Sequence, residues 1–148
     1  MNKENFSTQL TLWTNRVLAV LVFALVFFLP GLLRWYSGIR MLTEAEQKAI
    51  LLAFYACAVF VELAFFQVDR LLTAILAGKV FLRKNVRRIR IIQWCCAAVS
   101  LLCVFAAVFY LPLIFLVVIM AFLSLSVGVI ASVLDRAVVI REENDLTI

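Results

Sequence analysis

Long apolar stretches alternate with short polar segments along the chain. The first apolar stretch covers about residues 16–34, and the second covers 48–68 with one carboxylate, Glu62, in its interior. Thr43-Glu44-Ala45-Glu46 has the form of a capping box, which predicts that a helix begins there. An acidic residue at mid-membrane opposes insertion by about 2.5–3.5 kcal/mol, but the surrounding Leu, Ile, Phe and Val residues favour it by roughly 3–6 kcal/mol together. Both stretches are therefore predicted to cross a membrane as helices.

Residues 91–134 form an uninterrupted stretch of 44 residues without a charge. A single helix of that length would be about 66 Å long, whereas the core of a bilayer is about 30 Å thick. The stretch therefore predicts two crossings, over residues 91–111 and 113–134. Pro112 lies at its midpoint and is expected to break the helix, because proline disfavours helical backbone at the residue before it.

Composition supports this membrane interpretation. The chain of 148 residues is 66% apolar and 16% charged, with a mean hydropathy of +1.10. An average globular domain is about 45–50% apolar and about 25% charged, so the excess apolar surface must face lipid. This excludes an ordinary soluble enzyme, a disordered tail and a secreted disulfide scaffold. We predict a single all-α membrane domain over residues 1–148, with four transmembrane helices in an antiparallel bundle.

Lysine and arginine are distributed unequally among the segments that flank the spans. Loop 70–90 holds seven of them, the N-terminal segment and the tail 135–148 hold two each, and segment 34–48 holds three. With both termini and loop 70–90 in the cytoplasm, eleven positive residues lie inside and three outside. The positive-inside rule favours that orientation.

Candidate catalytic chemistry is sparse. The chain has no histidine, which is the commonest general base and the commonest metal ligand. Its four cysteines, Cys57, Cys95, Cys96 and Cys103, lie inside apolar runs without a C-x-x-C spacing, which is typical of cysteines that pack as small hydrophobes. We therefore expect no enzymatic activity, no metal and no cofactor.

The strongest polar feature is a cluster of cations just before the third span. Basic residues at this position are attracted to an anionic leaflet, so the cluster is a candidate contact for lipid or for a protein partner, or its charges only set the topology. Direct binding of nucleic acid is not expected, because the cluster has no interleaved aromatic residues and belongs to no recognised binding module. The acidic tail segment 142–145 can pair with the cluster, although exposed ion pairs contribute little. The cluster consists of Arg83, Lys84, Arg87, Arg88 and Arg90.

Two acidic residues, Glu62 and Asp69, lie on one face of the second helix, two turns apart. If Asp69 marks the inner interface, Glu62 is roughly 10 Å deep in the hydrocarbon. An ionisable residue at that depth is a candidate functional site. Two hypotheses remain open: Glu62 serves a small proton-coupled transporter or channel, or it is protonated and hydrogen-bonded to Ser100, Ser126 or another helix.

Small residues recur at helical spacing on both sides of Pro112. A hairpin that turns at this proline places Ser100 opposite Ser124, where the two hydroxyl groups are expected to share a hydrogen bond. Small residues let helices approach closely in lipid, so the pattern predicts a tight seam without an aqueous path. One stripe contains Cys96, Ser100 and Cys103, and the facing stripe contains Ser124, Gly128 and Ser132.

Two segments resemble a known family. Gly78-Lys79-Val80-Phe81, followed by Asn85 and Arg87-Arg88-Ile89-Arg90, is similar to the central motif of the bacterial family called domain of unknown function 2975. The ending Glu143-Asn144-Asp145-Leu146-Thr147-Ile148 resembles its C-terminal signature; Val80 departs from the family pattern, which often has proline there. The resemblance covers essentially the whole chain. It implies a small four-helix membrane protein without an established activity, whose relatives often accompany a small helix-turn-helix regulator.

Together these observations predict a multi-pass protein of a bacterial inner membrane with both termini cytoplasmic. We expect a non-enzymatic regulatory or accessory protein whose basic loop and tail contact anionic lipids. A cytoplasmic regulator of the helix-turn-helix type is the candidate protein partner, and a second copy of the chain is another. The alternative is a small proton-coupled transporter or channel that uses Glu62.

Overall fold

The computed structural model describes residues 3–39 and 43–146. These residues form four helices, α1 (Lys3–Ile39), α2 (Glu44–Leu76), α3 (Arg83–Ala107) and α4 (Leu113–Leu146), and the described ranges contain no strand. Each helix is long and apolar enough to cross a membrane, which confirms the prediction of an all-α chain with four such helices. Arg40 of segment 34–48 and the last two residues of the C-terminal signature, Thr147 and Ile148, lie outside the described residues.

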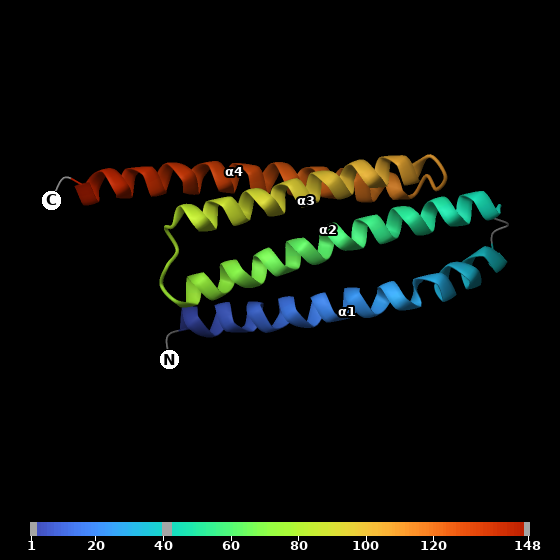
Figure 1. Ribbon diagram of the computed structural model, residues 1–148, viewed down its shortest axis with the longest axis horizontal. Coiled ribbons are helices and arrows are strands. Elements are labelled where there is room, and N and C mark those ends of the chain that lie inside the picture. The colour runs from blue at the N-terminus through green and yellow to red at the C-terminus, as the bar shows by residue number, and fades with distance from the viewer. Residues whose placement is uncertain (1–2, 40–42, 147–148) are drawn as a thin grey trace.

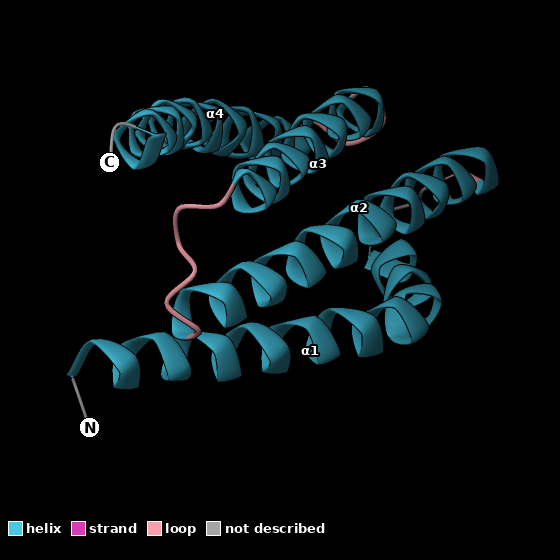
Figure 2. Ribbon diagram, turned by 60° about the vertical axis from the view of Figure 1, so that its left-hand side comes forward, coloured by secondary structure: helices cyan, strands magenta, loops and turns pink. Residues whose placement is uncertain are grey.

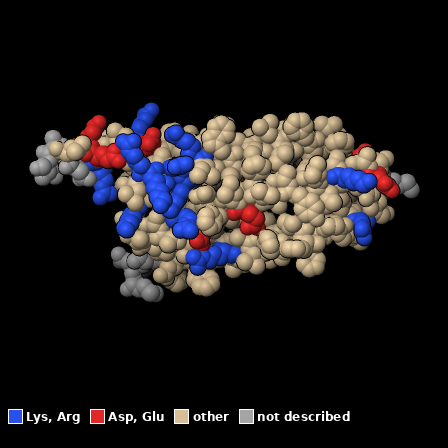
Figure 3. All heavy atoms as spheres, viewed as in Figure 1, with Lys and Arg blue, Asp and Glu red and all other residues tan. Residues whose placement is uncertain are grey.

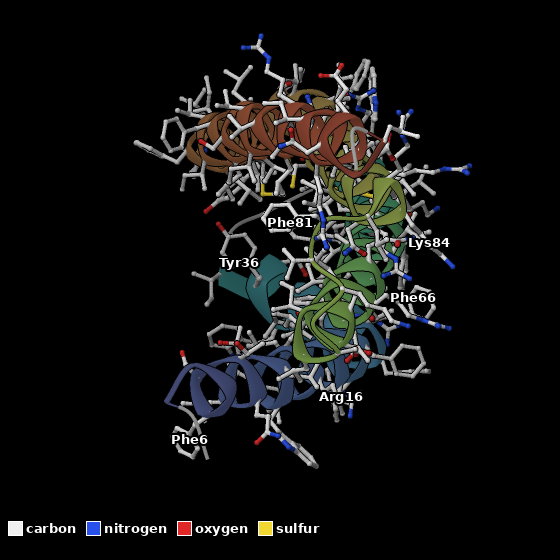
Figure 4. The ribbon with its side chains drawn as sticks, turned by 90° about the vertical axis from the view of Figure 1, so that its left-hand side faces the viewer. Phe6, Arg16, Tyr36, Phe66, Phe81 and Lys84 are labelled. Carbon is white, nitrogen blue, oxygen red and sulfur yellow. The ribbon has the colours of Figure 1, made fainter. Side chains whose placement is uncertain are left out.

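The helices lie side by side in the order of the sequence. Figure 1 shows the chain running back and forth along the long axis, and the N and C marks lie at the same end. Within the described ranges, α1 packs against α2, α2 against α3 and α3 against α4, whereas α1 and α4 do not pack against each other. Viewed end on, the four helices form an arc with α1 and α4 at its ends (Figure 4), so the bundle is open along one side.

Helix ends follow local sequence signals. At the start of α2, the Thr43 hydroxyl accepts a hydrogen bond from the Glu46 amide and the Glu46 carboxylate accepts one from the Thr43 amide, so the predicted capping box is confirmed. Helices α1, α2 and α4 extend beyond the predicted spans, and α3 begins before its predicted span, at Arg83. Residues 70–76 belong to α2 and 83–90 to α3, so most of loop 70–90 is helical and only the connector 77–82 lies outside helices (Figure 2).

The turn between α3 and α4 begins earlier than predicted. Helix α3 ends at Ala107 rather than at residue 111, and the Phe109 and Tyr110 amides both donate to the Ala106 carbonyl oxygen. The ring of Pro112 is incompatible with a helical carbonyl four residues earlier, at Val108, and it also disfavours helical backbone at Leu111. The centre of the turn is therefore near Tyr110 and not at the proline. The register of the hairpin shifts accordingly.

This shift makes the predicted hydrogen bond between Ser100 and Ser124 wrong. The Ser100 hydroxyl donates to the Val117 carbonyl oxygen at 3.1 Å, and the Ser124 hydroxyl donates to the Gln93 carbonyl oxygen at 3.1 Å. Residue 93 precedes Ser100 by about two helical turns. Both serines are buried, so each satisfies its hydroxyl on the backbone of the facing helix instead.

The small residues of the two stripes occupy different environments. Cys103 is buried, Cys96 is half-buried, and Gly128 contacts Gln93 so closely that a Cβ there would lie 2.6 Å from the Gln93 side-chain nitrogen. A turn centred on Pro112 would place Gly128 opposite Cys96, whereas the observed register places it against Gln93. Ser132 is exposed, and its hydroxyl donates to the Gly128 carbonyl oxygen of its own helix. Ser100, Ser124 and Gly128 therefore line part of the α3–α4 contact. Cys103, predicted to belong to the same seam, interacts instead with Cys57 of α2, and Ser132 lies outside the contact.

Apolar side chains cover most of the middle of the molecule, and most charges gather at its two ends, with one acidic patch between them (Figure 3). The three tryptophans lie near the ends of this apolar zone and are exposed: Trp13 by 66%, Trp35 by 68% and Trp94 by 70%. Arg16 and Trp35 are about 28 Å apart along α1, close to the thickness of a bilayer core of about 30 Å. This arrangement is typical of a protein with aromatic residues at both membrane interfaces.

Candidate functional site at the basic end

Positively charged side chains concentrate at one end of the molecule (Figure 3), the end at which both chain termini lie. Three segments meet there: the connector 77–82, the first two turns of α3 (83–90) and the C-terminal part of α4 (135–146). We call these three segments the basic end. They include all five cations that the sequence predicts as lipid or partner contacts.

The connector starts with a defined helix stop at the end of α2. The Gly78 amide donates to the Ile75 carbonyl oxygen and the Lys79 amide donates to the Ala74 carbonyl oxygen, which is the Schellman arrangement. Gly78 has a φ of 70°, a conformation that glycine adopts without the steric cost of a Cβ. The first glycine of the family-like motif therefore has a structural role, because it turns the chain out of α2.

Asn85 holds the connector against α3. Its side-chain amide is buried and donates to the Lys79 carbonyl oxygen at 2.6 Å and to the Val80 carbonyl oxygen at 3.0 Å. Arg88 continues the network: its guanidinium donates to the Asn85 side-chain oxygen at 3.1 Å and to the Arg70 carbonyl oxygen at 2.9 Å. Asn85 and Arg88 thus fasten α3 to the connector and to the end of α2.

The tail of α4 docks on the same end through charge. The Arg83 guanidinium forms three hydrogen bonds with the Glu142 carboxylate, at 2.7, 3.0 and 3.1 Å, and Arg141 lies over the Phe81 ring at 5.7 Å from its centroid. The hydrogen bond with Arg83 lowers the pKa of Glu142 below its ordinary value of 4.5, and Glu142 raises the pKa of Arg83. The pairing between tail and loop that the sequence permits is present in the structure.

The five predicted contact residues therefore divide into two groups. Arg83 and Arg88 are engaged within the molecule, and Arg90 lies 3.9 Å from the Asp135 carboxylate. Lys84 and Arg87 are exposed, and neither forms an ion pair with any residue in the described part of the chain. Lys84 points away from the helices (Figure 4). Of the five, these two are therefore the most available to an external anion, and Arg90 is only loosely compensated by Asp135.

The two acidic residues of α2 also differ. Asp69 pairs with Arg16 of α1 at 2.7 Å, so its charge is compensated at the end of the apolar zone. The Glu62 Oε1 atom is buried and has no hydrogen-bond partner among the described residues. Ser100 and Ser126 are the candidate hydrogen-bond partners of Glu62 in the sequence analysis. Their hydroxyl groups instead donate to the Val117 and Phe122 carbonyl oxygens, respectively.

Sequence reasoning missed two polar residues that contribute to helix packing. Asn15 is buried, and its side-chain amide donates to the Phe65 carbonyl oxygen of α2 at 3.2 Å. Gln93 contacts Gly128 and lines a groove between α3 and α4. A search for every uncharged amide side chain near an apolar run would have found both.

Comparison with known proteins gives one match. The model of the family described as "Protein of unknown function (DUF2975)" matches residues 4–148, essentially the whole chain, and confirms the family resemblance of the two sequence segments. No curated protein and no solved structure matches the chain.

Proposed function

The chain belongs to the DUF2975 family, whose function is unknown, and we propose that it is a non-enzymatic regulatory or accessory protein of a bacterial inner membrane. In this proposal the four helices span the membrane as an antiparallel bundle. Both termini and the basic end lie in the cytoplasm. The basic end contacts anionic lipid headgroups, and a cytoplasmic regulator of the helix-turn-helix type is its candidate protein partner.

The observation that carries this proposal is the unequal charge of the two ends of the apolar zone. Seven basic residues lie between positions 70 and 90, whereas segment 34–48 at the opposite end has three. Lys84 and Arg87 point their charges outward, where each adds about 1 kcal/mol of attraction to an anionic leaflet. The Schellman turn, Asn85 and Arg88 keep this surface in a fixed shape, which favours a defined docking surface over a mobile loop.

The alternative, a small proton-coupled transporter or channel, receives less support. Only Glu62 is an uncompensated acid within the apolar zone of the described chain, because Asp69 is paired with Arg16. A transport pathway normally brings several polar groups together on facing helices. The buried serines of α3 and α4 use their hydroxyl groups to join the two helices.

Cysteine accessibility tests the orientation. In a background with the four native cysteines replaced by alanine, Ser37→Cys should react with an impermeant thiol reagent in intact cells, and Lys84→Cys only after permeabilisation. Lys84 is suited to this test because its side chain is exposed. Labelling of Lys84→Cys in intact cells would place the basic end outside and contradict the proposal.

Lipid selectivity tests the contact itself. Spin-labelled phosphatidylglycerol and phosphatidylcholine can be compared at the surface of the reconstituted protein. The double variant Lys84→Gln/Arg87→Gln should lose much of the preference for phosphatidylglycerol. The matched control Arg34→Gln/Lys48→Gln removes two charges at the opposite end and should change the preference less. Equal effects of the two double variants would mean that net charge alone determines selectivity.

A further inference from the structure

A groove of about 640 Å³ runs along the outside of the contact between α3 and α4. Its polar end is formed by Arg90 and Gln93 of α3 and by Arg136 of α4, and its apolar part by Trp94, Leu125 and Val129. From Arg136 to Leu125 the groove extends about 16 Å along α4. It therefore passes from the level of the basic end into the apolar zone.

The floor of the groove on α4 is lined by Gly128 and Ser132, one turn apart. The Gln93 side chain lies against Gly128, whereas Ser132 has only a short side chain that does not fill the groove. The apolar side chains beside them face outward: Leu125 is 70% exposed, Val129 65% and Trp94 70%. An apolar chain lying in the groove would contact these three side chains.

Charge at the polar end is incompletely compensated. Arg136 forms no ion pair with any residue in the described part of the chain, and Arg90 has only the Asp135 carboxylate within reach, at 3.9 Å. The side-chain amide of Gln93, beside Gly128, adds a neutral polar group at the same level. Two guanidinium groups above an apolar groove are complementary to a phosphate attached to an acyl chain.

We propose that this groove binds one anionic phospholipid, with its phosphate between Arg90 and Arg136 and one acyl chain along Trp94, Leu125 and Val129. The proposal rests on the membrane placement in the proposed function and adds a defined site to it. Lys84 and Arg87 attract the leaflet in general, whereas the groove holds a single lipid molecule that stays with the protein.

Native mass spectrometry of the full-length protein in a mild detergent tests the site. Phosphatidylglycerol is the anionic probe, and phosphatidylcholine with the same acyl chains is the neutral one. We expect the protein to retain one phosphatidylglycerol and to release phosphatidylcholine at lower collision energy. Arg136→Gln should weaken retention about fivefold, the effect of one basic residue near a phosphate. Arg34→Gln removes the same charge at the opposite end of the apolar zone, away from the groove and the basic end, and should leave retention unchanged.

A steric variant tests the groove independently of charge. Ser132→Leu fills the floor, keeps both arginines and removes only a hydrogen bond within α4, so it should abolish the stoichiometric lipid while the fold is retained. Thermal unfolding of Arg136→Gln and Ser132→Leu checks that both variants fold. Because the first removes a charge and the second fills the groove, each variant tests the proposal independently.

Three results would overturn this assignment. Equal loss of lipid in Arg136→Gln and Arg34→Gln would show a general charge effect. Equal retention of the two lipids would remove the role of the arginines. A lipid-free dimer that Ser132→Leu dissociates would make the groove an interface between copies. None of these results changes the outcome expected from cysteine labelling or from the spin-label comparison. A negative result for the lipid site can therefore be distinguished from a negative result for the proposed function.

Discussion

The α3–α4 pair and the α1–α2 pair are held together by different means. Helix α3 packs against both α2 and α4 and has eight buried residues, and its contact with α4 includes two buried serines that donate to the facing backbone. In α1, the described residues include one buried residue, Asn15, which donates to Phe65 of α2. An ion pair between Arg16 and Asp69 adds a second polar link between α1 and α2.

The difference follows from the physics of helix association in lipid. Apolar side chains gain little free energy when a contact with lipid is replaced by a contact with another helix. Helix association therefore depends on close packing and on hydrogen bonds. Ser124 and Gly128 allow α3 and α4 to approach closely. Phe23, Phe27 and Phe28 of α1 are exposed instead, and α1 depends on polar contacts near one of its ends.

The largest expected effect contrasts two glycines. Gly128→Leu should lower stability by about 1–3 kcal/mol, because its side chain must displace Gln93 from the contact. Gly31→Leu is the matched control, since no atom lies within 4 Å of a Cβ at that position of α1. Thermal unfolding in detergent, followed by the reaction of a fluorogenic thiol reagent with the buried cysteines, measures both. Equal melting temperatures would mean that α3 and α4 are no more tightly packed than α1.

A smaller effect is expected where α3 meets the end of α2. Arg88→Gln should cost about 1 kcal/mol, because the Arg70 carbonyl oxygen and the Asn85 side chain lose a donor. Arg87→Gln removes an equal charge one residue away and should leave the melting temperature unchanged. The same unfolding measurement compares them, and a similar loss in both variants would show that charge, rather than this hydrogen-bond network, stabilises the junction.

The two acids of α2 provide a third comparison. Asp69→Asn should loosen α1 from α2 because Arg16 loses its partner, whereas Glu62→Gln should change stability by less than about 0.5 kcal/mol. Glutamine keeps the shape of the side chain and removes its titratable proton. Crosslinking between α1 and α2 and thermal unfolding measure the outcome. Loss of a pH-dependent phenotype in Glu62→Gln at normal protein levels would favour the transporter hypothesis.

The smallest expected effect concerns the docked tail of α4. Because Arg83 lowers the pKa of Glu142, their pairing is fully present above pH 4.5 and is lost as the pH falls through the lowered value. The effect is small because both side chains are largely exposed, 70% for Arg83 and 48% for Glu142. Hydrogen exchange of the last turns of α4, corrected for intrinsic rates, should lose protection at that pH. Glu142→Gln should remove this pH dependence, and an unchanged profile would exclude Glu142 as its cause.

Sequence alone determined the helices of this protein and the distribution of its charges. Hydropathy predicted four helices long enough to span a membrane, and the capping box at Thr43 predicted the start of α2, because these signals depend on neighbours within one or two turns. The family resemblance also came from short segments, and the match over residues 4–148 confirms it.

Only the tertiary structure decided which residues meet. The facing pairs of α3 and α4 depend on where the turn begins, and an early end of α3 replaced the expected pair of Ser100 and Ser124 with contacts to Val117 and Gln93. Likewise, Arg83 is engaged by Glu142, 59 residues away, while Arg87 is left exposed. Hydropathy and spacing along the sequence do not distinguish an arginine that forms an ion pair from one that does not. Pairing depends on distances between separate helices, and packing alone sets those distances.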